Sequence, residues 1–296
     1  MVREKFGWAL PSLQRLYRYI DQEFTLYFVD CGYPAAVRRQ IGDFFRDKNN
    51  VVEIRATRYL LPNESLNLVI DKATEKYICL VQNDVLIEPR FMDELLSTLQ
   101  KRQCAIVWPM TYEIQDGKRE PHRSEYTDTR IVEGKKFLQV QQVQPDDKIV
   151  TDPERQIHHV EMHCLMMTME AARALSPFPA INTREHIDLA VNAYRQGMSV
   201  FANEKAHANY VLPPIFDYDA DYFSFRWDLD VAIHSHNFVA ERWNIQPFPI
   251  AMSFVRHHRR FAQQTMRQSH PETISAEDLA PPICLLAQTP FLSEFS

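Results

Sequence analysis

Residues 77–85 read YICLVQNDV, a fully apolar pentapeptide that runs into amide and acidic side chains. Short apolar runs of this kind are typical of strands that are buried on both faces of a parallel sheet. Further strands are expected at 25–29, 51–56 and 104–108, separated by helices at 35–46, 63–74 and 89–101. Strands that alternate with helices at this spacing predict an α/β fold with right-handed crossovers and a mostly parallel sheet.

Composition excludes several classes of protein. The chain has 296 residues, 45% of them hydrophobic, and a net charge of −6, as expected for one large or two small globular domains. It contains no apolar run long enough to span a bilayer and begins without a long apolar leader, so we expect neither a membrane-spanning helix nor a secretory signal. Five scattered cysteines without a CxxC pair indicate reduced thiols and a cytoplasmic location. A pI of about 6.0 argues against a general nucleic-acid binder.

Glycine is scarce, with only six residues in the chain. Neither the dinucleotide fingerprint GxGxxG nor the phosphate loop GxxxxGKS or GxxxxGKT occurs. A nucleotide, if one binds, is therefore held without a glycine-rich loop.

The second half of the chain is organised differently. Residues 111–156 are polar with weak periodicity, which predicts an insertion or a long flexible loop. A strand is expected within 160–169, helices at 183–196, 228–243 and 250–267, and a tail rich in Pro and Ser after that.

Two carboxylates follow strands of the expected sheet. Asp30 comes directly after the strand at 25–29, and Asp84 comes shortly after the strand at 77–81. Ligands of open α/β sheets bind outside the carboxyl ends of the strands, where a carboxylate can hold a divalent cation or part of a nucleotide. The alternative is turn chemistry, since Asp and Asn are common after strands.

The start of the helix at 183–196 carries a third candidate site, with the sequence NTREHID at 182–188. Glu185 and Asp188 are three residues apart and therefore share one helix face. A helix N-terminus with Glu, His and Asp suits a catalytic base or an anion site. The alternative is a capping box between Asn182 and Glu185.

The order of these features resembles the nucleotide-sugar-dependent family 2 glycosyltransferases of GT-A fold. Asn83-Asp84-Val85 matches the DxD-type motif of that family, which implies that Asp84 holds Mn²⁺ or Mg²⁺ and, with Asn83, the sugar diphosphate. Asp30 matches the aspartate that reads the base, and Asn67 matches an asparagine near the nucleotide. The resemblance covers about residues 5–245.

The resemblance also implies the acceptor side of the site. Residues 184–189, REHIDL, match the EDxDL helix that supplies the base, with His186 where the family has an aspartate. The base is thus open among Glu185, Asp188 and His186, and we favour Glu185, with Asp188 as orienter or acceptor contact. His163 matches the strand that lines the sugar pocket, and His207 is a candidate further metal ligand.

The implied function is inverting transfer of a sugar from a nucleotide diphosphate sugar to a hydroxyl of a saccharide or lipid-linked acceptor. A catalytically inactive GT-A-like domain that binds a glycan or a partner protein is the alternative. A nucleotidyltransferase is a third reading, but it requires a glycine-rich phosphate loop. His158, His159 and His163 lack a Cys partner at zinc spacing, so we expect no zinc cluster among them.

The resemblance divides the chain into parts. We expect a nucleotide-binding half at 1–110, the insertion at 111–156, an acceptor and catalytic half at 157–215, a helical extension at 216–267 and a tail at 268–296. A basic run at 256–260 suits peripheral contact with anionic lipid at the inner membrane face. The family's first strand has no counterpart here, so we expect that residue 1 is not the native start or that the chain was shortened.

Overall fold

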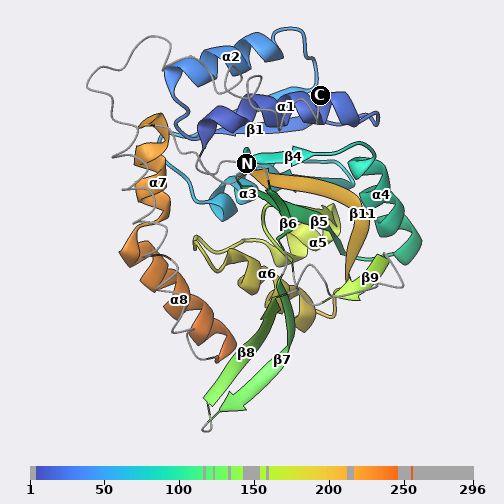
Figure 1. Cartoon of the computed structure of the whole chain (residues 1–296), viewed down its shortest axis with the longest axis vertical. Helices are drawn as coiled ribbons and strands as arrows, with labels where there is room; N and C mark the ends of the chain where they lie inside the picture. Colours follow the sequence, from blue (N-terminus) through green and yellow to red (C-terminus); the bar gives the residue numbers. More distant parts are fainter. Residues whose placement is uncertain are drawn as a thin grey trace.

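A mixed central sheet with helices on both sides organises the chain (Figure 1). The computed structural model describes residues 5–115, 118–122, 124–132, 135–142, 154–157, 160–211, 217–245 and 255. Within this part of the chain, no helix is both long and apolar enough to cross a membrane.

The N-terminal elements form a small parallel layer. The short helix η1 (Phe6–Trp8) leads into α1 (Ala9–Tyr19), and β1 (Leu26–Asp30) pairs in parallel with β2 (Val51–Arg55) across α2 (Ala35–Phe45). After β1 the chain turns at Gly32, whose φ is +112° and where a Cβ atom would lie 2.7 Å from the Tyr59 ring. Only glycine fits this turn without displacing that ring.

The larger sheet has the strand order β3-β10-β5-β11-β4. Its pairing of β11 with β5 is parallel, as the alternation of strands and helices predicts, whereas β10 runs antiparallel to β3 and β5, and β4 antiparallel to β11. The sheet is therefore mixed. Its strands are β3 (Tyr77–Val81), β4 (Val85–Ile87), β5 (Ile106–Gln115), β10 (Cys164–Thr168) and β11 (Val200–Val211). The helices around it are α3 (Pro62–Ile70), α4 (Phe91–Arg102), α5 (Met169–Leu175) and α6 (Glu185–Arg195).

The polar stretch 111–156 contains strands in its described residues rather than a long flexible loop. The end of β5 pairs with β6 (Lys118–Pro121), and β9 (Glu154–Ile157) pairs with β11. Between them β7 (Ser124–Val132) and β8 (Lys135–Gln142) form an antiparallel hairpin that projects from the sheet (Figure 1). The weak periodicity of this polar stretch did not predict these strands.

A cavity of about 430 Å³ separates β1 from β3. Among the described residues β1 pairs only with β2, and β3 pairs only with β10, so each presents an unpaired edge to this cavity. Helices α1 and α3 close the cavity with apolar side chains such as Leu13 and Leu66. The hydroxyl of Tyr27 on β1 donates to the Glu75 carboxylate before β3 at 3.2 Å. Helix α1 borders this interruption.

The C-terminal described elements are helical. After η2 (Asp217–Asp219) come α7 (Ala220–Arg226) and α8 (Leu229–Trp243), which agrees with the helix expected at 228–243. An apolar cluster of Ile187, Val239, Trp243 and two further isoleucines packs α8 against α6. Apart from Val255, the helix expected at 250–267, the basic run and the tail lie outside the described residues.

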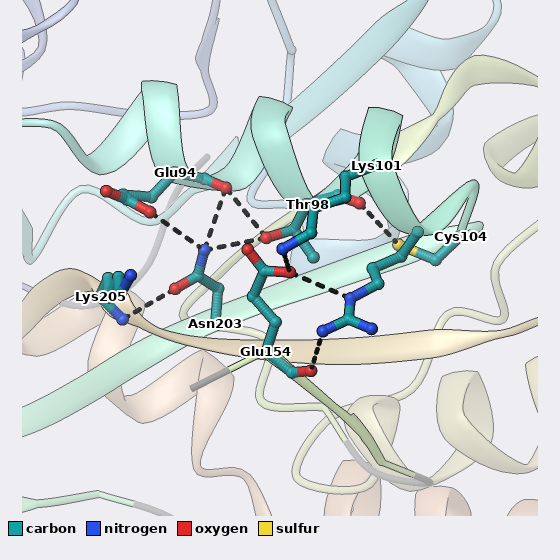
Figure 2. Close-up of polar contacts among 8 residues, drawn as sticks. Glu94, Thr98, Lys101, Cys104, Glu154, Asn203 and Lys205 are labelled. Carbon is teal, nitrogen blue, oxygen red and sulfur yellow. Dashed lines mark hydrogen bonds and ion pairs between the residues drawn. The ribbon is translucent and has the colours of Figure 1, made fainter. Parts of the chain in front are cut away.

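A buried polar network attaches α4 to the sheet (Figure 2). Asn203, fully buried at a bulge in β11, donates to the Thr98 hydroxyl at 2.8 Å and to the Glu94 carbonyl at 3.1 Å. Its own amide oxygen accepts from the Lys205 backbone N–H at 2.8 Å. Glu154 on β9 accepts from two basic residues at the end of α4. The Asn203 side chain therefore hydrogen-bonds both to α4 and to the backbone of the bulge in β11.

Asn203→Ala should lower the free energy of unfolding by about 1–3 kcal/mol, because it leaves buried hydrogen-bonding groups without their partner. Denaturant unfolding monitored by circular dichroism measures the change. Asn49→Ala, at an exposed position, is the control and should change stability by no more than about 0.5 kcal/mol. Equal midpoints for the two variants would contradict the role assigned to Asn203.

Candidate functional site

The Asp84 carboxylate lies fully buried after β3 and forms an ion pair with Lys5. The Lys5 ammonium is 3.4 Å from Asp84 Oδ2, donates to the Val211 carbonyl, and lies 4.4 Å from the centre of the Tyr210 ring. The Asn83 amide donates to the Lys5 carbonyl at 3.3 Å. Sequence reasoning missed Lys5, because one lysine before an apolar segment carries no signal that it will be buried.

The segment after Lys5 joins the N-terminus to the C-terminal helices. The Phe6 backbone N–H donates to Asp219 Oδ1 at 2.7 Å. The Phe6 ring packs against Tyr33 and Tyr222, with ring centres 4.7 and 5.4 Å away. The Tyr222 hydroxyl donates to the Leu60 carbonyl at 2.8 Å. Helix α7 is thereby held over the region that follows β1 and β3.

Asp30 is also buried, and both of its carboxylate oxygens have partners. Oδ1 accepts from the backbone N–H groups of Gly32 and Tyr33 at 3.1 Å each, and Oδ2 lies 2.9 Å from Arg38 Nε on α2. These contacts are those of the turn that the alternative interpretation describes. Burial raises the pKa of Tyr33 well above its usual range, and the charges of Asp30 and Asp84 raise it further. The structure thus brings both predicted carboxylates near one buried tyrosine.

Asn67 on α3 binds backbone in this structure. Its amide donates to the Phe178 carbonyl at 2.8 Å and accepts from the Phe178 N–H at 2.9 Å. Its neighbour Asn63 donates to the Pro179 carbonyl at 2.9 Å. The two asparagines anchor the segment between α5 and α6 to α3.

The two carboxylates of the REHIDL helix contact different elements. Glu185 Oε1 lies 3.7 Å from Arg226 Nη2 on α7, and both side chains are buried. Asp188 accepts from Arg242 Nη1 at 3.0 Å and from Trp243 Nε1 at 2.8 Å, both on α8. Burial raises the pKa of Asp188 despite the charge of Arg242. The distance from Glu185 to Arg226 is longer than either hydrogen bond of Asp188.

The capping box considered as the alternative interpretation of this helix start is not formed by Asn182, whose side-chain oxygen has no hydrogen-bond partner among the described residues. Arg184 is the N-cap residue and makes no side-chain capping bond, while the Asn182 amide donates to the Arg226 carbonyl. Asn182 therefore connects α6 to α7, and His186 lies half-buried on the first turn of α6.

The structure does not bring His207 to Asp84. On the paired strands β4 and β11, Asp84 lies opposite Val211 and Glu88 lies opposite His207. Four residues of strand separate the backbones by roughly 13 Å. His207 Nδ1 instead lies 3.3 Å from Glu88, whose hydrogen bond raises the pKa of His207. Burial alone would raise the pKa of Glu88, but hydrogen bonds from His207 and Asn209 lower it to about 2.

His163 joins the Asp84 region through an aromatic stack. Its ring stacks on Tyr210 with centres 4.0 Å apart, and Tyr210 also contacts Lys5. His163 Nδ1 lies 3.0 Å from Gln82 Oε1, and its Nε2 lies 3.1 Å from His122 Nε2. Sequence reasoning missed His122, because it lies in the polar stretch whose pattern pointed to no element.

A family model described as Glycosyl transferase family 2 matches residues 8–173, more than half of the chain. The chain belongs to glycosyl transferase family 2. The match includes β1, β3 and the residues that carry Asp30, Asn67, Asp84 and His163. The family resemblance expected from the sequence is therefore confirmed.

Solved structures of glycosyltransferases share the fold of this family 2 chain. The crystal structure of GalNAc-T7 with UDP, GalNAc and Mn²⁺ has a TM-score of 0.58 and 11% identity, and the match covers 88% of this chain. TarS 1–349 of S. aureus with UDP-GlcNAc has a TM-score of 0.51 at 14% identity, covering 81% of this chain and 69% of that chain. The mannosyltransferase PcManGT from Pyrobaculum calidifontis with GDP-Man and Mn²⁺ has a TM-score of 0.52 at 10% identity, covering 99% and 81%.

At these identities the likeness shows the fold, which confirms the expected GT-A architecture. The chain spans about half of the GalNAc-T7 structure, at 54% of its length. Among curated proteins, no sequence matches this chain.

His236 on α8 packs against the start of the candidate catalytic helix. Arg184 Nε donates to His236 Nδ1 at 3.4 Å, and burial together with the Arg184 charge lowers the pKa of His236 to about 4. The unfolded chain has the ordinary histidine pKa of about 6.5. Between pH 6.5 and about 4 the unfolded chain binds a proton at His236 that the folded chain does not. The free energy of unfolding is therefore highest above pH 6.5 and falls as the pH falls towards about 4.

Replacing His236 by Gln should therefore flatten the loss of stability between about pH 6.5 and 4, by at most about 3 kcal/mol. Urea unfolding at several pH values measures the slope. His234→Gln, at an exposed position on the same helix, is the matched control and should keep the wild-type slope. Parallel curves for wild type and His236→Gln would show that His236 does not titrate as the structure implies.

Proposed function

We propose that this chain transfers a sugar from a nucleotide diphosphate sugar to a hydroxyl acceptor, with inversion and with Mn²⁺ or Mg²⁺ at Asp84. The observation that carries the proposal is the family match together with a buried carboxylate, Asp84, after the strand where the family's DxD-type motif lies. The TarS and PcManGT neighbours are complexes with UDP-GlcNAc and GDP-Man, and the GalNAc-T7 and PcManGT neighbours are complexes with Mn²⁺.

The carboxylate oxygens of Asp84 are ligands of the kind that hard divalent ions prefer. Mg²⁺ and Mn²⁺ prefer oxygen ligands and are often bound by one or two carboxylates plus substrate phosphates. The ion would neutralise the leaving diphosphate. Lys5 balances the charge of the same carboxylate oxygen in this structure, so an ion at Asp84 competes with the Lys5 ammonium.

Glu185 is the base that we favour. Its carboxylate would accept the proton of the acceptor hydroxyl while that oxygen bonds to the anomeric carbon and the bond to the diphosphate oxygen breaks. The Arg226 guanidinium at 3.7 Å holds Glu185 in position. Asp188 is occupied by Arg242 and Trp243, which suits a positioning role. His186 is the remaining candidate on the same turn.

The remaining assignments of the donor site are proposals as well. We infer that Asp30 and Asn67 lie beside the nucleotide and that His163 lies beside the sugar, with residues 1–110 as the nucleotide-binding half and 157–215 as the acceptor half. The acceptor is a saccharide or a lipid-linked saccharide. A cytoplasmic location is supported by four free cysteines among the described residues, of which Cys79 has a pKa raised to about 12 by burial.

One set of observations favours a catalytically inactive domain that binds a glycan or a partner protein. Lys5 pairs with Asp84, Arg38 pairs with Asp30, and Asn67 binds the Phe178 backbone. These three residues predicted to bind the nucleotide sugar therefore already have contacts within the chain. The two candidates differ in whether a nucleotide sugar can replace these contacts.

A panel of UDP-, GDP- and dTDP-sugars, each with and without Mn²⁺, tests the donor site by thermal shift. A ligand at a hundred times its Kd adds about 2.7 kcal/mol, which shifts Tm by several degrees. We expect a Mn²⁺-dependent shift with one nucleotide. The comparison variant is Lys5→Met/Asp84→Asn, because changing Asp84 alone leaves a buried ammonium uncompensated. The shift should disappear in this variant, and a shift that persists would refute the role of Asp84.

Glu185→Gln should leave the thermal shift intact and lower the rate of nucleotide diphosphate release at least about 100-fold, as expected for loss of a general base. Glu170→Gln, at an exposed position on α5, should keep the wild-type rate. Full turnover in Glu185→Gln would exclude Glu185 as the base. Donor binding without turnover in the wild-type chain would favour the inactive domain.

A further inference from the structure

Three potential metal ligands from separate parts of the chain meet beside β6 and β10. His122 directly follows β6, while Glu161 and His163 precede β10. One ligand atom from each residue lies within 4.8 Å of those of the other two. His158 and His159 lie outside the described residues.

The spacing of the two imidazoles suits a shared ion. His122 Nε2 and His163 Nε2 are 3.1 Å apart. Two nitrogens bound to one tetrahedral Zn²⁺ at 2.0–2.1 Å lie about 3.3 Å from each other. An ion between them therefore requires side-chain shifts of only a few tenths of an ångström in this pair.

The outer nitrogen of each ring has an oxygen partner. His122 Nδ1 lies 2.5 Å from Glu113 Oε1, and His163 Nδ1 lies 3.0 Å from Gln82 Oε1. Metal-bound histidines almost always donate their second N–H to such an oxygen, which fixes the tautomer and the ring orientation. With both Nδ1 atoms protonated, the two Nε2 lone pairs face each other, an arrangement that a cation between them stabilises.

The surroundings hold the site in place and leave it accessible. His163 is buried and stacks on Tyr210, so its ring is held rigidly. The His122 side chain is 27% exposed, which gives an ion a route from solvent. Glu161 supplies a carboxylate ligand and Glu113 a second negative charge close by. Together they offset the charge of a divalent ion, and three protein ligands leave a fourth position for water or a ligand oxygen.

We infer that His122, Glu161 and His163 form a binding site for a divalent transition-metal ion of the Zn²⁺ class, distinct from the metal predicted at Asp84. Two imidazoles and one carboxylate suit Zn²⁺ better than Mg²⁺, which prefers oxygen ligands throughout. The inference does not depend on sugar transfer, because it concerns the ion alone.

Calorimetric titration of the chelator-treated full chain with Zn²⁺, without nucleotide, tests the site. We expect one equivalent to bind, and at least about 100-fold weaker binding in His122→Gln and His163→Gln. Glu113→Gln should weaken binding by about 10- to 100-fold, since it removes the negative charge of an outer partner of a ligand. His234→Gln, at an exposed position on α8, is the control and should bind like the wild type. Absence of Zn²⁺ binding, or equal binding by His122→Gln, would overturn the inference.

Replacing Zn²⁺ by Co²⁺ identifies the ligands independently. A tetrahedral nitrogen and oxygen site gives visible d–d bands without a sulfur-to-cobalt charge-transfer band. A charge-transfer band would place the ion at a cysteine and refute the proposed ligands. If His163→Gln does not fold, which circular dichroism without metal will show, the partly exposed His122 carries the test alone. Loss of binding in Lys5→Met/Asp84→Asn with retention in His122→Gln would assign the ion to the Asp84 site instead.

Discussion

The buried ion pair between Lys5 and Asp84 is the interaction on which this end of the molecule depends. A carboxylate without solvent contact is costly unless a positive charge and hydrogen bonds compensate it. Lys5 provides that charge, and its position is set by the Val211 carbonyl, the Tyr210 ring and the Asn83 amide. The next residue, Phe6, therefore lies where its backbone N–H donates to Asp219 and its ring packs against Tyr222 of α7. The need to balance the charge of the buried Asp84 carboxylate thus connects the N-terminal segment, the central sheet and the C-terminal helices.

Helix α6 makes the second set of connections between halves of the chain. Its two acidic residues point to different helices, Glu185 to Arg226 on α7 and Asp188 to Arg242 on α8. Asn182, just before the helix, binds the carbonyl of that same Arg226. The polar contacts that orient the candidate base are therefore also those that dock the C-terminal helices. Positioning of the proposed base and packing of the helices thus involve the same residues, which explains why spacing alone could not separate the two roles.

Much of the fold could be predicted from local patterns. The apolar run at 77–81 corresponds to β3, although its residues alternate between half-buried and buried instead of being buried on both faces. The helices at 183–196 and 228–243 correspond to α6 and α8, because their burial is reflected in periodicity along the chain. The family membership could be predicted as well, from the order of Asp30, Asn83-Asp84 and the REHIDL helix. The strands within 111–156 could not, since this polar stretch shows only weak periodicity.

The sequence by itself determined the succession of strands and helices, the absence of a glycine-rich phosphate loop and the family, because these depend on neighbours in the chain. Only the tertiary structure decided which polar side chains meet. Lys5 reaches Asp84 across 79 residues and Val211 across 206, and His122 reaches His163 across 41. Such contacts follow from the strand order, which brings these distant segments together. No local pattern records that choice, because it belongs to the packed sheet and not to any one segment.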